Sequence, residues 1–179
     1  MSYPVKMLTT AATKQGLRFL VIGGHAVNAY APPRATLDVD LLIRATDRDL
    51  WQKLAEAEGY CLLNDGTSFL QFSPPYGVPF RLDFMLVNDP TFSALSTDST
   101  GAACLGVTVQ VPSPLNLIAL KLHAIRYGPG SRKDKDWLDI LNIIRAIELD
   151  PKDAALKSAF DRHGTAGLYA ELLERCSRG

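Results

Sequence analysis

Two short apolar segments, separated by a glycine pair and a proline pair, constrain the fold more than any other feature of the sequence. Residues 17–22 form an almost wholly apolar run of the kind found in buried strands, and the run ends at Gly23 and Gly24. Residues 25–31 can form a short helix that the two following prolines end. Residues 36–44 alternate well enough to form a second strand. The pattern predicts a strand, a glycine turn, a short helix and a strand in direct succession.

The rest of the chain divides into a mixed half and a helical half. Residues 4–15 are expected to form a helix that ends at a glycine, and a second helix is expected from Thr46 or Asp47 to about Glu58. Three strands joined by turns, a loop to about residue 106, one more strand and four helices should follow. The expected segments are 60–64, 68–73 and 79–87 for the three strands, 107–111 for the last strand, and 113–128, 134–148, 151–164 and 166–176 for the helices.

These elements predict an α+β fold. Residues 1–111 are expected to form a core around a mixed sheet with flanking helices, and residues 112–179 a helical part packed on that core. A chain of 179 residues has the length for one compact domain with such an appendage.

Charge and cysteine content limit the class of protein. The 19 basic and 19 acidic residues cancel, which argues against a constitutive nucleic-acid binder with an extended basic surface. Cys61, Cys104 and Cys176 are odd in number and contain no Cys-x-x-Cys pair, so neither a disulfide framework nor a zinc knuckle is expected. The polar N-terminus and the lack of an apolar run of ~20 residues predict a cytoplasmic protein without membrane association.

Two aspartates on the second predicted strand are candidate metal ligands. Asp38 and Asp40 are two residues apart, so on a strand both carboxylates project to the same side. Two anions that close repel each other unless a cation lies between them. Mg²⁺ takes hard oxygen ligands, commonly one or two carboxylates plus substrate phosphates. The alternative is that both aspartates belong to the solvated face of an ordinary strand.

A third acidic residue and the glycine pair favour the metal site. Asp83 interrupts an otherwise apolar strand, where an unpartnered acid would be costly to bury. A neighbouring strand can bring it beside Asp38 and Asp40. Gly23 and Gly24 lie where a strand turns into a helix, and their missing side chains allow a phosphate to approach backbone N–H groups.

This ordered combination resembles the nucleotidyltransferase superfamily that is built on the DNA polymerase β core. The resemblance rests on the glycine pair, the short helix, the Asp-x-Asp strand and a later strand with an isolated aspartate. More narrowly, "GGHAV", "RATLDVDLLI", "LIALKLHAIR" and "KDWLDI" are similar to AbiEii-like nucleotidyltransferases, many of which are toxins of toxin-antitoxin pairs. The resemblance covers residues 15–147 and implies the mixed β-sheet of the nucleotidyltransferase fold.

The resemblance also implies roles in nucleotide binding. Gly23 and Gly24 would seat the β- and γ-phosphates of an NTP. Gly24 stands where the superfamily usually has serine, so backbone amides would replace a hydroxyl contact. Lys121 would reach the triphosphate, oriented by Asp136 or Asp139. Alternatively, Lys121 only packs its stem on the core while its amine reaches solvent.

Two further residues near the glycines are candidates. Arg34, which the Pro-Pro turn places ahead of the Asp-x-Asp strand, would neutralise phosphate charge or, alternatively, pair with an acid. His25 abuts the glycines and could donate a hydrogen bond to a phosphate, or it is an ordinary polar residue at a helix N-terminus.

The implied reaction is transfer of a nucleoside monophosphate from an NTP to an acceptor hydroxyl, with release of pyrophosphate. Two Mg²⁺ ions would be held by Asp38 and Asp40, and Asp83 would complete the site of the ion next to the acceptor and take the acceptor's proton. The acceptor would be a tRNA, a protein or a small molecule. The toxin-type relatives imply a cognate antitoxin as a further partner.

Two other functions compete with this one. A dinucleotide-binding domain also has a strand that runs into a glycine turn, but no Gly-x-Gly-x-x-Gly is completed after Gly24, and two aspartates follow too early for a single ribose-binding acid. A catalytically silent nucleotidyltransferase fold that only binds a partner protein is the second alternative. The complete set of three aspartates argues against it.

Overall fold

The computed structural model describes residues 3–177, which form two compact units. The first unit is drawn from Met1–Ala29 and Arg34–Pro112, and the second from Tyr30–Pro33 and Ser113–Gly179. The mixed helix and strand content confirms the predicted α+β fold class. No helix within residues 3–177 has the length and apolar character needed to span a bilayer.

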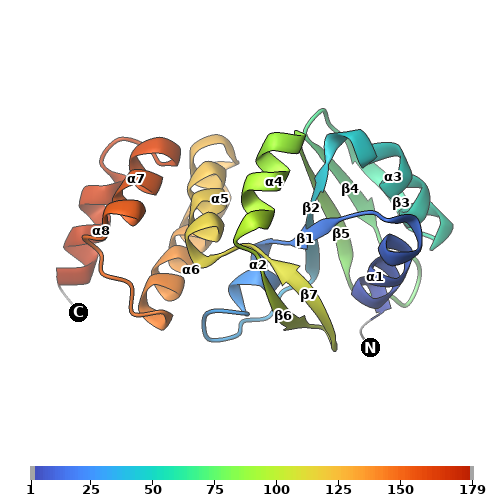
Figure 1. Cartoon of the computed structure of the whole chain (residues 1–179), viewed down its shortest axis with the longest axis horizontal. Helices are drawn as coiled ribbons and strands as arrows, with labels where there is room; N and C mark the ends of the chain where they lie inside the picture. The colour runs from blue at the N-terminus through green and yellow to red at the C-terminus, as the bar shows by residue number, and fades with distance from the viewer. Residues whose placement is uncertain (1–2, 178–179) are drawn as a thin grey trace. The chain divides into compact units, whose positions relative to one another are not determined.

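A five-stranded mixed sheet forms the framework of the first unit (Figure 1). Its strand order is β1-β2-β5-β4-β3, with β2 and β5 parallel and the other neighbours antiparallel. The meander of three strands predicted after the second helix is confirmed as β3, β4 and β5. A second sheet pairs β6 with β7. The strands are β1 (Phe19–Val21), β2 (Asp38–Arg44), β3 (Cys61–Asp65), β4 (Phe69–Ser73), β5 (Arg81–Val87), β6 (Thr100–Cys104) and β7 (Val107–Val111).

Helix packing leaves the two faces of the large sheet chemically different. Trp51 of α3 is fully buried, and its ring lies 5.4 Å from the Phe19 ring and 5.7 Å from the Phe84 ring, so α3 covers the face to which these residues point. Side chains alternate along a strand, so Asp83, next to Phe84, points to the opposite face. The helices of this unit are α1 (Tyr3–Gln15), α2 (Gly23–Val27), α3 (Arg48–Ala57) and α4 (Asp89–Thr97).

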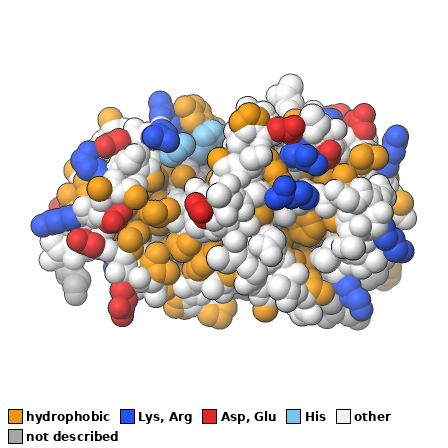
Figure 2. Space-filling model, viewed as in Figure 1, with side chains coloured by type: hydrophobic (Ala, Val, Ile, Leu, Met, Phe, Trp, Pro, Cys, Tyr) orange, Lys and Arg blue, Asp and Glu red, His pale blue; other side chains and the backbone are white. Residues whose placement is uncertain are grey.

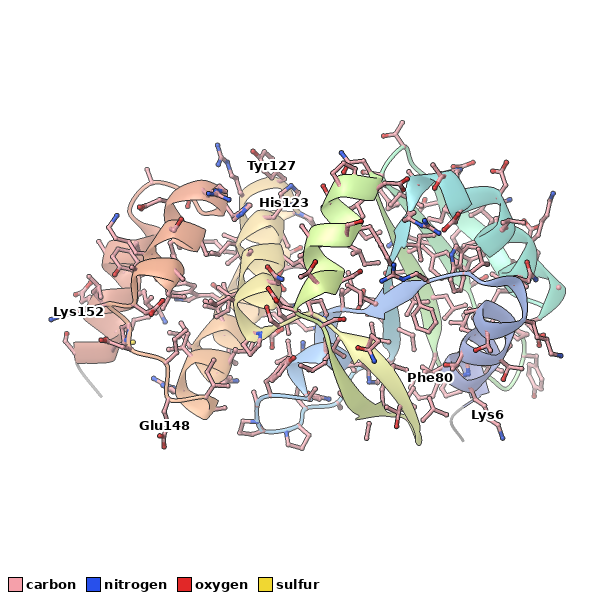
Figure 3. The ribbon with its side chains drawn as sticks, in the orientation of Figure 1. Lys6, Phe80, His123, Tyr127, Glu148 and Lys152 are labelled. Atoms are coloured by element: carbon pink, nitrogen blue, oxygen red, sulfur yellow. The ribbon has the colours of Figure 1, made fainter. Side chains whose placement is uncertain are left out.

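The second unit is helical, and its helices pack as α5 on α6, α5 on α7 and α7 on α8. Ser113 caps α5 as predicted, because its hydroxyl accepts a hydrogen bond from the Asn116 amide. On the outer side of α5, the exposed side chains of His123 and Tyr127 lie together, with ring centroids 4.6 Å apart (Figure 3). The helices are α5 (Pro114–Tyr127), α6 (Lys133–Ala146), α7 (Ala154–His163) and α8 (Leu168–Ser177).

The loop predicted up to residue 106 is wrong, because it contains α4 and β6. Asn88 starts α4 by accepting a hydrogen bond from the Thr91 amide at 2.9 Å. Strand β6 has the sequence "TGAAC", which lacks the β-branched and aromatic residues that signal a strand, and its pairing with β7 supplies the missing stability. Leu105 and Gly106 both have positive φ (48° and 83°) and close that hairpin in two residues.

Two helix starts also differ from the sequence prediction. Helix α7 begins at Ala154 rather than at the predicted Pro151, because the Asp153 carboxylate accepts hydrogen bonds from the Ala155 and Leu156 amides and forms the cap. Helix α2 begins at Gly23, two residues before the predicted start, so both glycines belong to its first turn.

Candidate active site

Three of the predicted site residues lie on one face of the large sheet. Strands β2 and β5 are parallel, and their register pairs Asp40 directly with Asp83. Residues that pair across neighbouring strands point to the same side of a sheet, and Asp38, two residues before Asp40, shares that side. All three aspartates are half-buried, whereas their strand neighbours Val39 and Leu82 are fully buried on the other face. The alternation of the sequence therefore places the three acids on the face opposite α3.

The carboxylate of Asp40 lies against the backbone of Gly23. A Cβ atom on Gly23 would sit 1.9 Å from Oδ2 of Asp40, closer than any atoms can approach. Gly23 also has φ of +62°, which a residue with a side chain rarely adopts. Both facts require glycine at this position, because any side chain would displace the Asp40 carboxylate.

A short chain of amide side chains holds Asp83 from the neighbouring strands. Gln71 of β4 pairs with Asp83 in the register, and its Nε2 donates to Asp83 Oδ2 at 3.2 Å. Asn64 of β3 in turn donates from Nδ2 to Gln71 Oε1 at 2.8 Å. This chain reaches the Asp83 carboxylate from β4, which flanks β5 on the edge away from β2 and Asp40.

Arg34 and Thr36 occupy the space above Gly24. A Cβ atom on Gly24 would lie 2.9 Å from the Thr36 hydroxyl oxygen and 3.1 Å from Nη2 of Arg34. Asn28 fixes the backbone of Arg34, because its Nδ2 donates to the Arg34 carbonyl oxygen at 2.8 Å and its Oδ1 accepts from the Arg34 amide at 3.0 Å. The guanidinium is therefore beside the second glycine.

His25 also borders this cluster. Burial lowers the pKa of His25 below its ordinary value, the positive charge of Arg34 lowers it further, and the Asp38 carboxylate opposes both effects. Its buried Nε2 atom has no hydrogen-bond partner among residues 3–177. The ring lies 6.2 Å from the Phe80 ring. The imidazole therefore lies near enough to Arg34 and Asp38 for both charges to act on its pKa.

The structure brings together Gly23, Gly24, Arg34, Asp40 and Asp83, and it places Asp38 on the same face. Within residues 3–177, no group of three or more His, Cys, Asp and Glu side chains is arranged so that it could hold a metal ion. The assignment of the three aspartates as metal ligands stays a prediction.

Lys121 belongs to the second unit and forms a buried charge cluster there. Its Nζ lies 2.6 Å from Oδ1 of Asp136 and 2.9 Å from Oδ2 of Asp139. Lys121 is 6% exposed, Asp136 4% and Asp139 1%. The interpretation of Lys121 as a residue whose amine reaches solvent is therefore wrong, and both candidate partners pair with it. Its predicted contact with a triphosphate stays a prediction.

Three residues near the site were missed in the sequence. Thr, Gln and Asn occur often in turns and strands that have no role in a site. The residue types of Thr36, Gln71 and Asn28 alone therefore gave no signal. Gln71 did carry a signal that could have been used. It is the single polar residue in the apolar stretch "FLQF", just as Asp83 interrupts its own apolar strand.

Comparison with known proteins supports the sequence resemblance. The family model described as "Nucleotidyl transferase AbiEii toxin, Type IV TA system" matches residues 7–178. No curated protein sequence matches the chain significantly.

Several solved structures share the fold. The solution structure of the antibiotic-resistance factor ANT(2'')-Ia has a TM-score of 0.67 at 16% identity and covers 98% of this chain and 96% of its own. A crystal structure of ANT(2'')-Ia in complex with adenylyl-2''-tobramycin has a TM-score of 0.68 at 15% identity, covering 91% and 98%. The lincomycin-bound lincosamide antibiotic adenylyltransferase LnuA has a TM-score of 0.55 at 13% identity, covering 78% and 93%. At these identities the likeness shows a shared nucleotidyltransferase fold.

Proposed function

Because the chain belongs to the AbiEii family of nucleotidyl transferases, we propose that it transfers a nucleoside monophosphate from an NTP to an acceptor hydroxyl in an Mg²⁺-dependent reaction. The observation that carries this proposal is the direct pairing of Asp40 with Asp83, with the Asp40 carboxylate packed on Gly23. The pairing brings two carboxylates to one face of the sheet beside the glycine pair.

The donor set on this face fits Mg²⁺. Carboxylate oxygens are the hard ligands that this ion takes in proteins, together with oxygens of substrate phosphates. Asp38, Asp40 and Asp83 would hold two such ions, which supply charge neutralisation for the phosphates and stabilise the transition state by several kcal/mol. The alternative of a purely solvated strand face explains less well why Gly23 leaves room for one of these carboxylates.

The other residues of the cluster would bind the nucleotide. Gly23 and Gly24 begin α2, and their backbone amides would donate to the β- and γ-phosphates, while the Arg34 guanidinium, beside Gly24, would neutralise part of the phosphate charge. The Thr36 hydroxyl occupies the same space and donates a long hydrogen bond of 3.5 Å to the Asp38 carbonyl oxygen, which it would exchange for one to a phosphate oxygen. Arg34 and Thr36 would together take over the contact that a serine makes in related proteins.

The reaction would proceed as an in-line displacement at the α-phosphorus. The acceptor oxygen forms a bond to that phosphorus while the bond to the oxygen that bridges to the β-phosphate breaks, and pyrophosphate leaves. The proton of the acceptor hydroxyl goes to Asp83, whose carboxylate Gln71 holds in place.

The family description and one related structure favour a biological role and a class of acceptor. The Type IV toxin-antitoxin description of the family supports a toxin with a cognate antitoxin. A complex with adenylyl-2''-tobramycin is recorded for ANT(2'')-Ia, which supports a small-molecule hydroxyl as one acceptor class. A tRNA or a protein hydroxyl is the other class that we propose to test.

The test is incubation of the purified protein with each α-³²P-labelled NTP and, separately, total RNA, total protein or a panel of hydroxyl-bearing small molecules. We expect label in one fraction, dependent on Mg²⁺. The variant Asp83→Asn should abolish labelling, while the matched control Asp98→Asn, at an exposed aspartate of the same unit, should not. Label in no fraction, with every NTP tested, would favour the silent fold that only binds a partner.

A further inference from the structure

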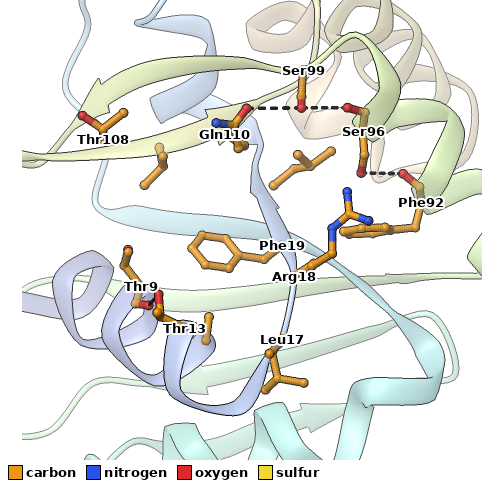
Figure 4. Close-up of a pocket in the computed structure, with 14 residues that line it drawn as sticks. Thr9, Thr13, Leu17, Arg18, Phe19, Phe92, Ser96, Ser99, Thr108 and Gln110 are labelled. Carbon is orange, nitrogen blue, oxygen red and sulfur yellow. Dashed lines mark hydrogen bonds between the residues drawn. The ribbon is translucent and has the colours of Figure 1, made fainter.

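A pocket of about 360 Å³ lies in the first unit between α1, β1, α4 and β7 (Figure 4). None of the residues proposed above for nucleotide transfer lines it. Its floor is apolar and buried, since Leu20 is 2%, Phe92 1% and Val109 5% exposed. A volume of this size is at the lower end of the range for sites that bind small molecules.

A cation lies at the mouth of this pocket. Arg18 is exposed, and its guanidinium carbon lies 5.6 Å from the centre of the Phe92 ring, which forms part of the floor. Within residues 3–177, no ion pair or hydrogen bond ties the Arg18 guanidinium to a carboxylate. Figure 2 shows Lys and Arg side chains over the region of α4, beside exposed apolar surface. The pocket thus combines an apolar floor with a positive rim.

Most hydroxyl groups of the lining already donate their hydrogens to the protein. Those of Thr9, Thr13 and Ser96 donate to backbone carbonyl oxygens one helical turn back, at 2.7 to 2.9 Å. The Ser99 hydroxyl lies 2.8 Å from the Ser96 carbonyl oxygen and 3.3 Å from Oε1 of Gln110 (Figure 4). The single hydrogen of the Ser99 hydroxyl is shared between these two acceptors, and the NH₂ group of Gln110 is a donor at the rim whichever acceptor takes it.

The remaining side-chain groups at the rim are therefore hydrogen-bond donors with a net positive charge. They are the Arg18 guanidinium, the Gln110 amide and the Thr108 hydroxyl, and no Asp or Glu lines the pocket. We propose that this pocket is a second binding site, for a small molecule that carries a carboxylate or phosphate on an apolar body. The anionic group contacts Arg18 and Gln110, and the apolar body fills the space over Leu20, Phe92 and Val109.

Isothermal titration calorimetry on the full chain tests this site with three probes that share one ring system. They are 1-naphthoate, 1-naphthyl phosphate and the neutral 1-naphthalenemethanol. We expect the neutral probe to bind at least tenfold more weakly than the better of the two anions. Whichever anion binds more tightly identifies the natural group as a carboxylate or a phosphate. Failure of both anions to bind, or equal binding of all three probes, overturns the proposal.

Two variants and a control locate the binding. Arg18→Gln should weaken the anions at least tenfold and remove their advantage over the neutral probe. Thr13→Phe, at an exposed position of the pocket wall, should block all three probes by filling the cavity. Lys14→Gln is the control, because Lys14 is exposed and follows Thr13 but does not line the pocket. Removal of its positive charge should leave binding unchanged. If Lys14→Gln and Arg18→Gln weaken binding equally, the pocket is not the site. The transfer assay is independent of these measurements, because no residue is shared.

Discussion

Asp40 and Asp83 are directly paired on neighbouring strands, and each residue is half-buried. Like charges on directly paired strand residues destabilise a sheet. A metal ion bound between the two carboxylates would supply the opposite charge that offsets this repulsion.

The variant Asp40→Asn separates this interpretation from an ordinary solvated strand. A neutral amide relieves the repulsion with Asp83, so the metal-free protein should melt at the same temperature or slightly higher, with a stability change within about 0.5 kcal/mol or in the stabilising direction. Label transfer should fall by orders of magnitude, because one ligand charge is lost where phosphates must be neutralised. Thermal unfolding and labelling on the same preparation decide the case, and full activity in a folded variant would return these aspartates to the solvent face of a strand.

The crowded space over Gly24 can be tested by substitution. A methyl group there would lie 2.9 Å from the Thr36 hydroxyl oxygen, too close for an undisturbed contact. Gly24→Ala should therefore displace Thr36 and Arg34 and weaken NTP binding by about tenfold, in line with the ~1–3 kcal/mol cost of overpacking. Thr36→Ala removes the closest of these contacts but keeps the Thr36 Cβ and Arg34 Nη2, each 3.1 Å away, so the double variant should recover part of the lost affinity. Gly130→Ala, where a Cβ meets nothing within 4 Å, is the control.

Titration of a fluorescent NTP analogue measures the four variants. If the losses of NTP affinity in Gly24→Ala and Thr36→Ala simply add in the double variant, the two side chains do not share the space over the glycine turn.

At the scale of elements, the sequence predicted helices and strands where pattern and end signals agreed. Ser113 and Pro114 mark the start of α5, and the alternation around Asp38 marks β2. Of the two missed elements, β6 lacks such signals and is a strand through its pairing with β7, so tertiary pairing overrode a weak intrinsic preference there. Helix α4 carries start signals of the same kind as α5, an Asn88 cap and a proline in the first turn, and the prediction overlooked them.

The contact between α5 and α6 includes a buried cluster of one cation and two anions. Lys121 lies within hydrogen-bonding distance of both Asp136 and Asp139, and all three are nearly inaccessible to solvent. Lys121→Met would leave two buried carboxylates without a counter-charge, which should destabilise the protein by about 3–5 kcal/mol. Adding Asp136→Asn and Asp139→Asn should recover a large part of that loss, because no buried charge then remains.

Urea unfolding of the single and triple variants measures this cluster. Lys135→Met, at an exposed lysine of the same helix α6, is the control and should change stability by no more than about 0.5 kcal/mol. A Lys121→Met protein as stable as the parent, yet inactive in transfer, would instead assign the lysine to nucleotide binding.

At the scale of the whole molecule, the sequence could predict which residue types form the site but not how they meet. Strand periodicity put Asp38 and Asp40 on one face from local sequence alone. The register that sets Asp83 opposite Asp40 depends on a parallel pairing across 43 positions of sequence, which periodicity cannot specify. The approach of Arg34 and Thr36 to Gly24 likewise depends on the path of the chain after the Pro-Pro turn, as Asn28 fixes it.

Toxin activity is a property of the intact protein and can be tested by expression in cells. If the chain acts as a toxin through nucleotide transfer, induced expression in a bacterial host should arrest growth, and coexpression of its cognate antitoxin should relieve the arrest. Asp83→Asn, expressed to the same level and equally folded, should not arrest growth, whereas Asp98→Asn should arrest it fully. Growth arrest by Asp83→Asn would separate toxicity from transfer, because that variant keeps the fold and surface but loses the carboxylate that is proposed to take the acceptor's proton. Viable counts after induction, read beside labelling of the same lysates, distinguish these outcomes.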